Sequence, residues 1–180
     1  MEAVRRAVHI AFGSGAFLLF FVDALVVCVL ALAAVLYNGF VAPHLRLDRA
    51  YRRPGEPRLS GLVTYPLAVL LLALLLPWRA AGGAWIVLAV ADPMAGMAGT
   101  LRPRPRVPWN RRKSLVGAAT GFAAGGLACY AYLAAADVVA PFPSALAAAA
   151  AGALAETLPL PEDNLAVAFA AGAALYFCLG

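Results

Sequence analysis

The first part of the chain is an apolar run, residues 7–42, that contains a single charged residue, Asp23. A transmembrane helix needs about 20 consecutive apolar residues, with a range of about 17–25, so this run is too long for one helix. We expect it to divide at Asp23 into two segments, Ala7–Val22 and Ala24–Ala42. Hydrophobic residues make up 64% of the chain, against about 45–50% in soluble domains. A water-soluble fold of this size cannot bury so much apolar surface, so lipid must be the main solvent.

Five more apolar segments follow, and none shows the alternation of polar and apolar residues that is typical of strands. They are rich in Ala and Leu and long enough for helices, whose backbone groups satisfy one another within lipid. Their predicted bounds are Ser60–Trp78, Gly83–Gly99, Ser114–Ala136, Phe142–Leu158 and Asn164–Leu179. The predicted fold class is all-α: a polytopic membrane helical bundle of about seven transmembrane helices, forming one integral-membrane domain over residues 1–180.

The distribution of positive charge predicts the orientation, because Lys and Arg favour cytoplasmic loops. With a cytoplasmic N-terminus, the inner loops are residues 1–6, 43–59, 100–113 and 159–163. These loops contain every one of the 14 Lys and Arg residues except Arg79. We therefore expect an integral membrane protein whose N-terminus and basic loops face the cytoplasm.

Glycines recur at every fourth position in the fifth segment, at Gly117, Gly121 and Gly125. Small residues at this spacing are typical of close helix packing, either within one subunit or between two copies in a homo-oligomer. Gly13-Ser14-Gly15 follows no predicted strand, and the sequence contains no P-loop pattern. A nucleotide would therefore have to be bound by another device.

Ionisable residues gather at the inner ends of the predicted helices. They are Arg6 and His9 in the first, Asp92 in the fourth, the basic loop 102–113, Glu156 in the sixth, and Glu162, Asp163 and Asn164 at the start of the seventh. The basic loop alone is typical of a topology determinant or a lipid-headgroup contact. Asp163 alone is typical of a helix N-terminus, as a cap or as a partner of the helix dipole.

Asp92 is harder to explain by topology, since ionisable groups at membrane depth are rare and usually functional. Pro93, which follows it, predicts a helix break whose freed backbone groups line a cavity or pack within protein. Together, the acids and the bases indicate phosphate chemistry. Carboxylates and substrate phosphates suit Mg²⁺, Lys and Arg neutralise phosphate charge, and phosphoryl transfer depends mainly on positioning and charge stabilisation.

Four blocks of sequence resemble motifs of the CTP-dependent polyprenol kinase family, which includes dolichol kinases, phytol kinases and a CTP-dependent diacylglycerol kinase. The blocks are Arg5-Arg6-Ala-Val-His9, Gly61-Leu-Val-Thr-Tyr65-Pro66-Leu67, Asp92-Pro-Met-Ala95-Gly96-Met-Ala-Gly99 with Lys113-Ser114-Leu-Val-Gly117, and Glu156 with Glu162-Asp163-Asn164-Leu165. They span nearly the whole chain in order. Arg6 and Glu162 depart from the family pattern but keep its charge, and Ala168 stands where a proline often follows.

The resemblance implies a membrane enzyme that transfers the γ-phosphate of CTP, with Mg²⁺ or another divalent cation, to the hydroxyl of a lipid alcohol at the cytoplasmic face. Together with the shared membrane face, it assigns catalytic roles to Asp92, Lys113, Asp163 and His9. It assigns nucleotide or phosphate binding to Arg6, Gly96, Gly99, Arg112, Lys113, Ser114, Gly117 and Asn164. It assigns the metal to Asp92, Glu156 and Asp163, with Asp92 favoured over Asp163 as the base.

The expected partners are CTP, a phytol-type or polyprenol-type alcohol and the membrane, with no nucleic acid. Two other functions remain open at this stage. A CDP-lipid synthase would use the same nucleotide, although the chain lacks the long acidic terminal signature of those enzymes. A small transporter would also carry intramembrane acids, although no repeat of matched broken helices is evident.

Overall fold

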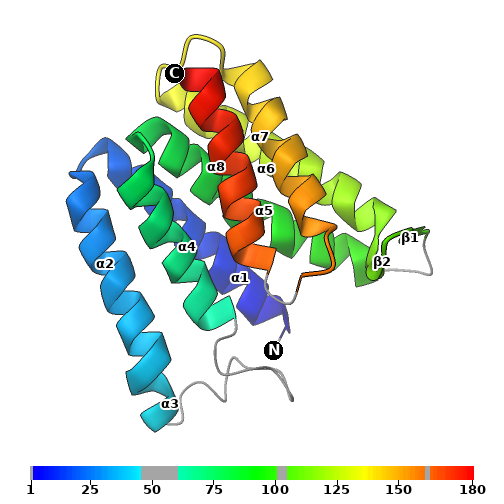
Figure 1. The fold of residues 1–180 in the computed structure, drawn as a ribbon, viewed down its shortest axis with the longest axis horizontal. Helices are drawn as coiled ribbons and strands as arrows, with labels where there is room; N and C mark the ends of the chain where they lie inside the picture. The colour runs from blue at the N-terminus through cyan, green and yellow to red at the C-terminus, as the bar shows by residue number, and fades with distance from the viewer. Residues whose placement is uncertain (1, 46–60, 101–104, 161–162) are drawn as a thin grey trace.

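The computed structural model describes residues 2–45, 61–100, 105–160 and 163–180, with side chains described from Arg6 onward. They form a helical bundle with one short β-hairpin (Figure 1). The helices are α1 Glu2–Gly13, 3₁₀-helix η1 Ser14–Phe20, α2 Ala24–Leu36, π-helical turn η2 Tyr37–Val41, α3 Ala42–His44, α4 Gly61–Leu75, α5 Trp78–Thr100, α6 Leu115–Ala135, α7 Pro141–Glu156 and α8 Asp163–Leu179. The strands are β1 Arg106–Val107 and β2 Asn110–Ser114.

Three helical stretches within the described residues are long and apolar enough to cross a membrane: Ala24–His44, Trp78–Thr100 and Leu115–Ala135. Shorter apolar helices cover Arg6–Phe20, Gly61–Leu75 and Asp163–Leu179. The bundle is therefore helical and of membrane type, as the sequence predicts. The count of seven spans and the cytoplasmic N-terminus stay predictions.

The long N-terminal apolar run divides at Asp23, as predicted. Asp23 has extended backbone angles and is the N-cap of α2, where its Oδ1 accepts a hydrogen bond of 2.7 Å from the Leu25 N–H. A carboxylate at this position satisfies a backbone donor that the helix leaves unpaired. The only charge in the run thus marks a turn between helices.

Two predicted features of α4 and α5 are wrong. The third segment was expected to run to Trp78, but α4 ends at Leu75, and Trp78 begins α5 after Pro77. Pro93 was expected to break a helix, but α5 continues through it, with Pro93 buried. A proline inside a helix removes one backbone hydrogen bond, and the contacts of α5 with α1, α4, α6, α7 and α8 offset that loss.

The segment that joins α5 and α6 is not only a basic loop, because its described part folds into an antiparallel hairpin. Arg106 pairs with Ser114 and Val107 pairs with Asn110. Two side chains fix the hairpin to the end of α7. The Trp109 Nε1–H donates to Thr157 Oγ1 at 3.2 Å, and the Asn110 Nδ2–H donates to the Leu158 carbonyl at 3.1 Å.

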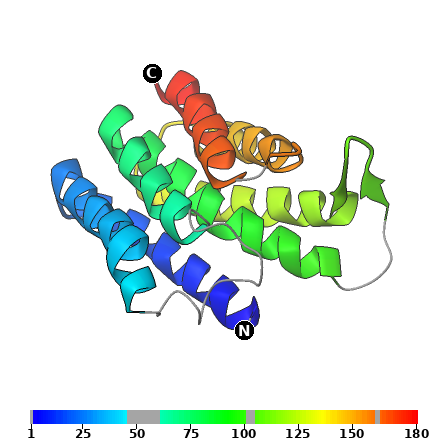
Figure 2. The same cartoon turned by 60° about the horizontal axis from the view of Figure 1, so that its bottom comes forward.

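The glycine repeat of α6 packs against α5 within the same subunit. A Cβ added to Gly117 would lie 2.8 Å from the Ala95 carbonyl oxygen, and one added to Gly121 would lie 2.9 Å from that of Ala91. The two backbones therefore touch, which only glycine permits. Figure 2 shows α5 and α6 side by side, with α7 and α8 on one side of the pair and α1 on the other.

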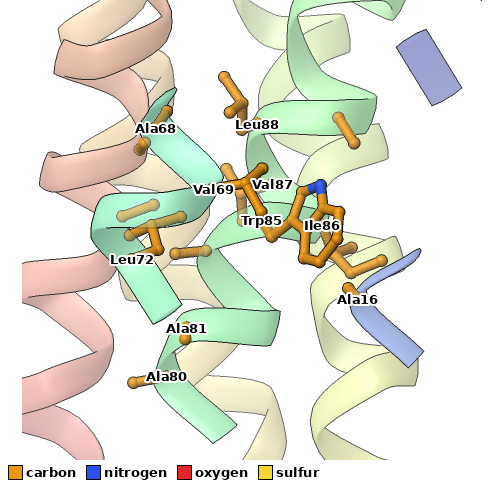
Figure 3. Packing of buried hydrophobic residues seen from close by; sticks show 14 of the residues in the cluster. Ala16, Ala68, Val69, Leu72, Ala80, Ala81, Trp85, Ile86, Val87 and Leu88 are labelled. Carbon is orange, nitrogen blue, oxygen red and sulfur yellow. The ribbon is translucent and has the colours of Figure 1, made fainter. Parts of the chain in front are cut away.

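The hydrophobic core centres on α5. Trp85, Ile86, Val87 and Leu88 are buried there among Ala68, Val69 and Leu72 of α4 and Ala16 of η1 (Figure 3). Because α5 contacts α1, α4, α6, α7 and α8, most of the bundle packs around it. Asp92 lies on this central helix.

Candidate active site

A cavity of about 1420 Å³ opens at the end of the bundle where α1, α4 and α8 begin and α5 and α7 end. Every side chain that was predicted from the sequence to take part in a site lines it. These are Arg6, His9, Asp92, Gly96, Gly99, Arg112, Lys113, Ser114, Gly117, Glu156, Asp163 and Asn164. Residues separated by most of the chain length are therefore brought to one place.

Lys113 of β2 is the centre of this polar end. Its Nζ lies 2.6 Å from Asp163 Oδ2 at the start of α8 and 3.1 Å from Glu156 Oε1 at the end of α7. Glu156 is buried, and the side chains of Lys113 and Asp163 are 28% and 29% exposed. The ammonium thus joins the hairpin to two helices through charge-assisted hydrogen bonds, which are stronger than neutral ones.

The charges around Lys113 determine its protonation. Burial alone lowers the pKa of its ammonium, but the nearby carboxylates of Glu156, Asp163 and Asp92 outweigh that effect and raise the pKa above its ordinary value. Three acids therefore surround one amine that stays charged at physiological pH. Lys has three N–H donors, and two of them are used by Glu156 and Asp163.

The glycines of α5 make room for other site residues. A Cβ on Gly96 would lie 3.3 Å from Arg6 Nη2, so the guanidinium of Arg6 lies against the backbone of α5. A Cβ on Gly99 would lie 3.4 Å from Ser114 Oγ. Ser114 is the N-cap of α6 and accepts a hydrogen bond of 2.9 Å from the Gly117 N–H. Ser114 and Gly117 therefore shape the start of α6 beside the cavity.

Asn164 joins α8 to α4. Its Nδ2–H donates to Thr64 Oγ1 at 3.1 Å, and both side chains are buried. This contact fixes the first turn of α8, which also presents Asp163 to Lys113. Arg112 lines the cavity from the exposed edge of the hairpin, while Glu162 of the closing motif lies outside the described residues.

Two aromatic residues in the cavity received no role from the sequence. The ring of Tyr65 on α4 meets the ring of His9 edge to face, with centroids 4.3 Å apart. The Tyr65 hydroxyl accepts a hydrogen bond of 2.9 Å from the buried Trp85 Nε1–H. Tyr65 belongs to one of the motif blocks, so the sequence offered a signal for a role in the site. The sequence offered no such signal for Trp85, because a single Trp in an Ala-rich segment is typical of a buried core residue.

Asp92, Glu156 and Asp163, the residues predicted to bind the metal, do not form a preassembled metal site. Among the residues that the structure describes, no group of three or more His, Cys, Asp or Glu side chains could hold a metal ion. The reason is visible in the geometry, since Lys113 occupies the position on which Glu156 and Asp163 converge. The divalent cation stays a prediction from the sequence, and no chemical step below depends on it.

Comparisons with protein-family models, with curated proteins and with solved structures found no match. The resemblance to polyprenol kinases therefore depends on the motif blocks themselves.

Proposed function

We propose that the protein is a CTP-dependent lipid-alcohol kinase, which transfers the γ-phosphate of CTP to the hydroxyl of a phytol-type or polyprenol-type alcohol at the cytoplasmic face of the membrane. The products are the lipid monophosphate and CDP. The observation that carries the proposal is the cavity, which combines acids and bases at one end with apolar side chains at the other. Its volume of about 1420 Å³ exceeds the ~300–1,000 Å³ of most single-ligand pockets, which supports a site for two substrates.

The basic side chains of the cavity suit a triphosphate. Arg6, Arg112 and Lys113 reach it from α1 and from the hairpin, and guanidinium and ammonium groups neutralise phosphate oxygens. Among the described residues Lys113 donates to Glu156 and Asp163, and its third N–H can donate to a phosphate oxygen. Those two carboxylates hold the ammonium in place, which is positioning of the kind that phosphoryl transfer requires.

Asp92 is the proposed general base. The alcohol oxygen attacks the γ-phosphorus and forms a new P–O bond, while the bond between that phosphorus and the β–γ bridging oxygen breaks. The electron pair of the broken bond stays on CDP, and the hydroxyl proton passes to the Asp92 carboxylate. The choice of CTP rather than another nucleotide comes from the motif resemblance.

The test uses the full-length protein in lipid nanodiscs with CTP, ATP or GTP labelled on the γ-phosphate. Phytol, farnesol, geranylgeraniol, a long polyprenol and diacylglycerol are offered as acceptors, with and without Mg²⁺. We expect label on an isoprenoid alcohol and release of CDP. Release of pyrophosphate would identify a cytidylyltransferase instead, and solute flux without phosphotransfer would identify a transporter.

A matched pair of variants makes the test specific. Asp92→Asn should lower turnover by about 10²–10⁴-fold, the usual contribution of a general base. Asp137→Asn is the control, because Asp137 lies in the turn between α6 and α7 and has a positive φ of 53° that Asn tolerates. Full turnover by Asp92→Asn would contradict the assignment of the base.

A further inference from the structure

The cavity has an apolar arm that the polar chemistry does not use. It extends from the site along α1 and η1, α2 and α4. Its lining includes Phe12, Gly15 and Leu18 of α1 and η1, Val27, Leu30, Ala31 and Ala34 of α2, and Val69 of α4, with Trp85 of α5. Polar and charged residues line the other end, so the cavity is amphipathic along its length.

The spacing of these residues shows the shape of the arm. On α2 the lining residues are Val27, Leu30, Ala31 and Ala34, and Asn38 of the following turn η2 also lines the cavity. Their spacings of three and four positions place them on one face of the helix. The groove therefore runs along this face, parallel to the axis of α2. From Val27 to Asn38 the groove extends about 16 Å, at about 1.5 Å of rise per residue.

The helix packing leaves this groove open. α2 packs chiefly against α4, and α1 packs chiefly against α5, and residues of both α1 and α2 line the groove. Three lining side chains, Phe12, Leu18 and Leu30, are also exposed at the surface of the bundle. In a membrane this surface faces lipid, so the arm is accessible from the bilayer while the polar end is accessible from water.

Small side chains create the space at the centre of the arm. Ala31 and Ala34 lie where most positions of α2 carry Leu or Val. At Gly15, an added Cβ would lie 2.8 Å from the Trp85 ring. Trp85 is in turn held by its hydrogen bond to Tyr65. The end of the arm at Trp85 is therefore rigid. The width of the arm depends on small residues such as Gly15, Ala31 and Ala34.

We infer that the apolar arm binds the hydrocarbon chain of one single-chain alcohol, with its hydroxyl at Asp92 and its chain along the stripe Val27, Ala31 and Ala34. The role of the hydroxyl rests on the proposed function, while the chain site rests on the groove. An extended alkyl chain gains about 1.25 Å per carbon–carbon bond, so a groove of about 16 Å covers about 13 bonds. The structure thus assigns a chain-length preference near tetradecanol, whose carbon chain has that many bonds, beyond which a chain leaves the groove and enters lipid.

Binding is measured without nucleotide. The full-length protein in nanodiscs is exposed to tetradecanol that carries a photoactivatable diazirine on its chain, and the labelled peptides are identified by mass spectrometry. We expect label on the groove faces of α2 and α4. Unlabelled octanol, dodecanol, tetradecanol and eicosanol should compete with rising strength up to tetradecanol and no further. This series uses the wild-type chain and is independent of whether a variant folds.

Two adjacent alanines provide the matched variants. Ala34 lines the groove, whereas Ala33 is exposed and absent from the lining. Ala34→Phe should displace about two methylene groups of the ligand and lower its affinity about tenfold, and Ala33→Phe should leave it unchanged. Equal labelling of both variants, label spread over the outer face of α2, or equally strong competition by a two-chain diacylglycerol would overturn the inference.

The outcomes separate this inference from the proposed function. Label in the groove without phosphotransfer from any nucleotide would leave the chain site standing and remove the kinase. Phosphotransfer together with label only on the outer surface would support the kinase and remove the chain site.

Discussion

The α5–α6 pair and α2 differ in how they are packed. In the α5–α6 pair the backbones touch through Gly117 and Gly121, and α5 is mostly buried within the bundle. By contrast, α2 packs chiefly against α4, and large side chains such as Leu25 and Val29 are exposed on its outer face. The charged side chains of the site are on or next to the first region, while the second provides one wall of the apolar arm. The proposed chemistry depends on fixed distances and lies beside the densest packing, whereas the proposed wall of the chain site is packed most loosely.

The largest effect is expected at Lys113, a charged residue next to the densely packed α5–α6 pair. Lys113→Met leaves Glu156 and Asp163 without their shared cation. Breaking a buried pair costs about 3–5 kcal/mol of unfolding free energy, and we expect the lower end of this range because the Lys113 and Asp163 side chains are partly exposed. Turnover should fall below detection. The control is Arg111→Met on the same strand, because Arg111 is exposed and does not line the cavity. Thermal unfolding in detergent and labelled-CTP turnover measure the two effects, and similar losses in both variants would refute the central role of Lys113.

A glycine substitution tests the packing difference directly. Gly121→Ala places a methyl group against the Ala91 carbonyl oxygen and should cost about 1–3 kcal/mol by overpacking. Gly39→Ala, in η2 after α2, meets nothing within 4 Å and should stabilise the helix by about 0.5–1 kcal/mol. If the two substitutions changed the unfolding free energy in the same direction, the contrast between the regions would be wrong.

Tyr65→Phe should have a smaller effect. It removes the acceptor of the Trp85 Nε1–H, a hydrogen bond worth about 0.5–1.5 kcal/mol, while the ring contact with His9 is kept. Tryptophan fluorescence should report a change around Trp85, and competition by tetradecanol should weaken. Unchanged competition would show that Trp85 is fixed by packing alone.

The smallest effect is expected on the outer face of α2. Leu32→Ala removes a side chain that is 46% exposed, and substitutions away from packed features usually change stability by about 0.5 kcal/mol or less. Turnover and chain-length preference should both be unchanged. A large loss of turnover would indicate that this face has a partner.

The sequence was sufficient to predict the helical fold and the division at Asp23, because both follow from the length of apolar runs and the position of charges. It also predicted which residues share one end of the bundle. The hairpin was missed because β2 contains Asn110, Arg111, Arg112 and Lys113, a run that has the composition of a solvated loop. Its strand form depends on contacts of Trp109 and Asn110 with the end of α7, which are separated from them by 48 positions.

Other features depended on tertiary packing that periodicity does not encode. Pro93 is typical of a break, and only the surrounding helices keep α5 continuous. The glycine repeat predicted close packing but not its partner, which proved to be α5. The metal assignment treated Glu156 and Asp163 as free ligands, because nothing in their spacing reveals that the ammonium of Lys113 lies between them.

The pairing of Lys113 with Asp163 has a consequence for biosynthesis. The two residues are 50 positions apart, so a nascent chain exposes the amine well before its second acid is synthesised. Until α8 packs beside α4, the hairpin lacks part of its charge compensation and the cavity lacks one wall. Completion of the site therefore waits for α8.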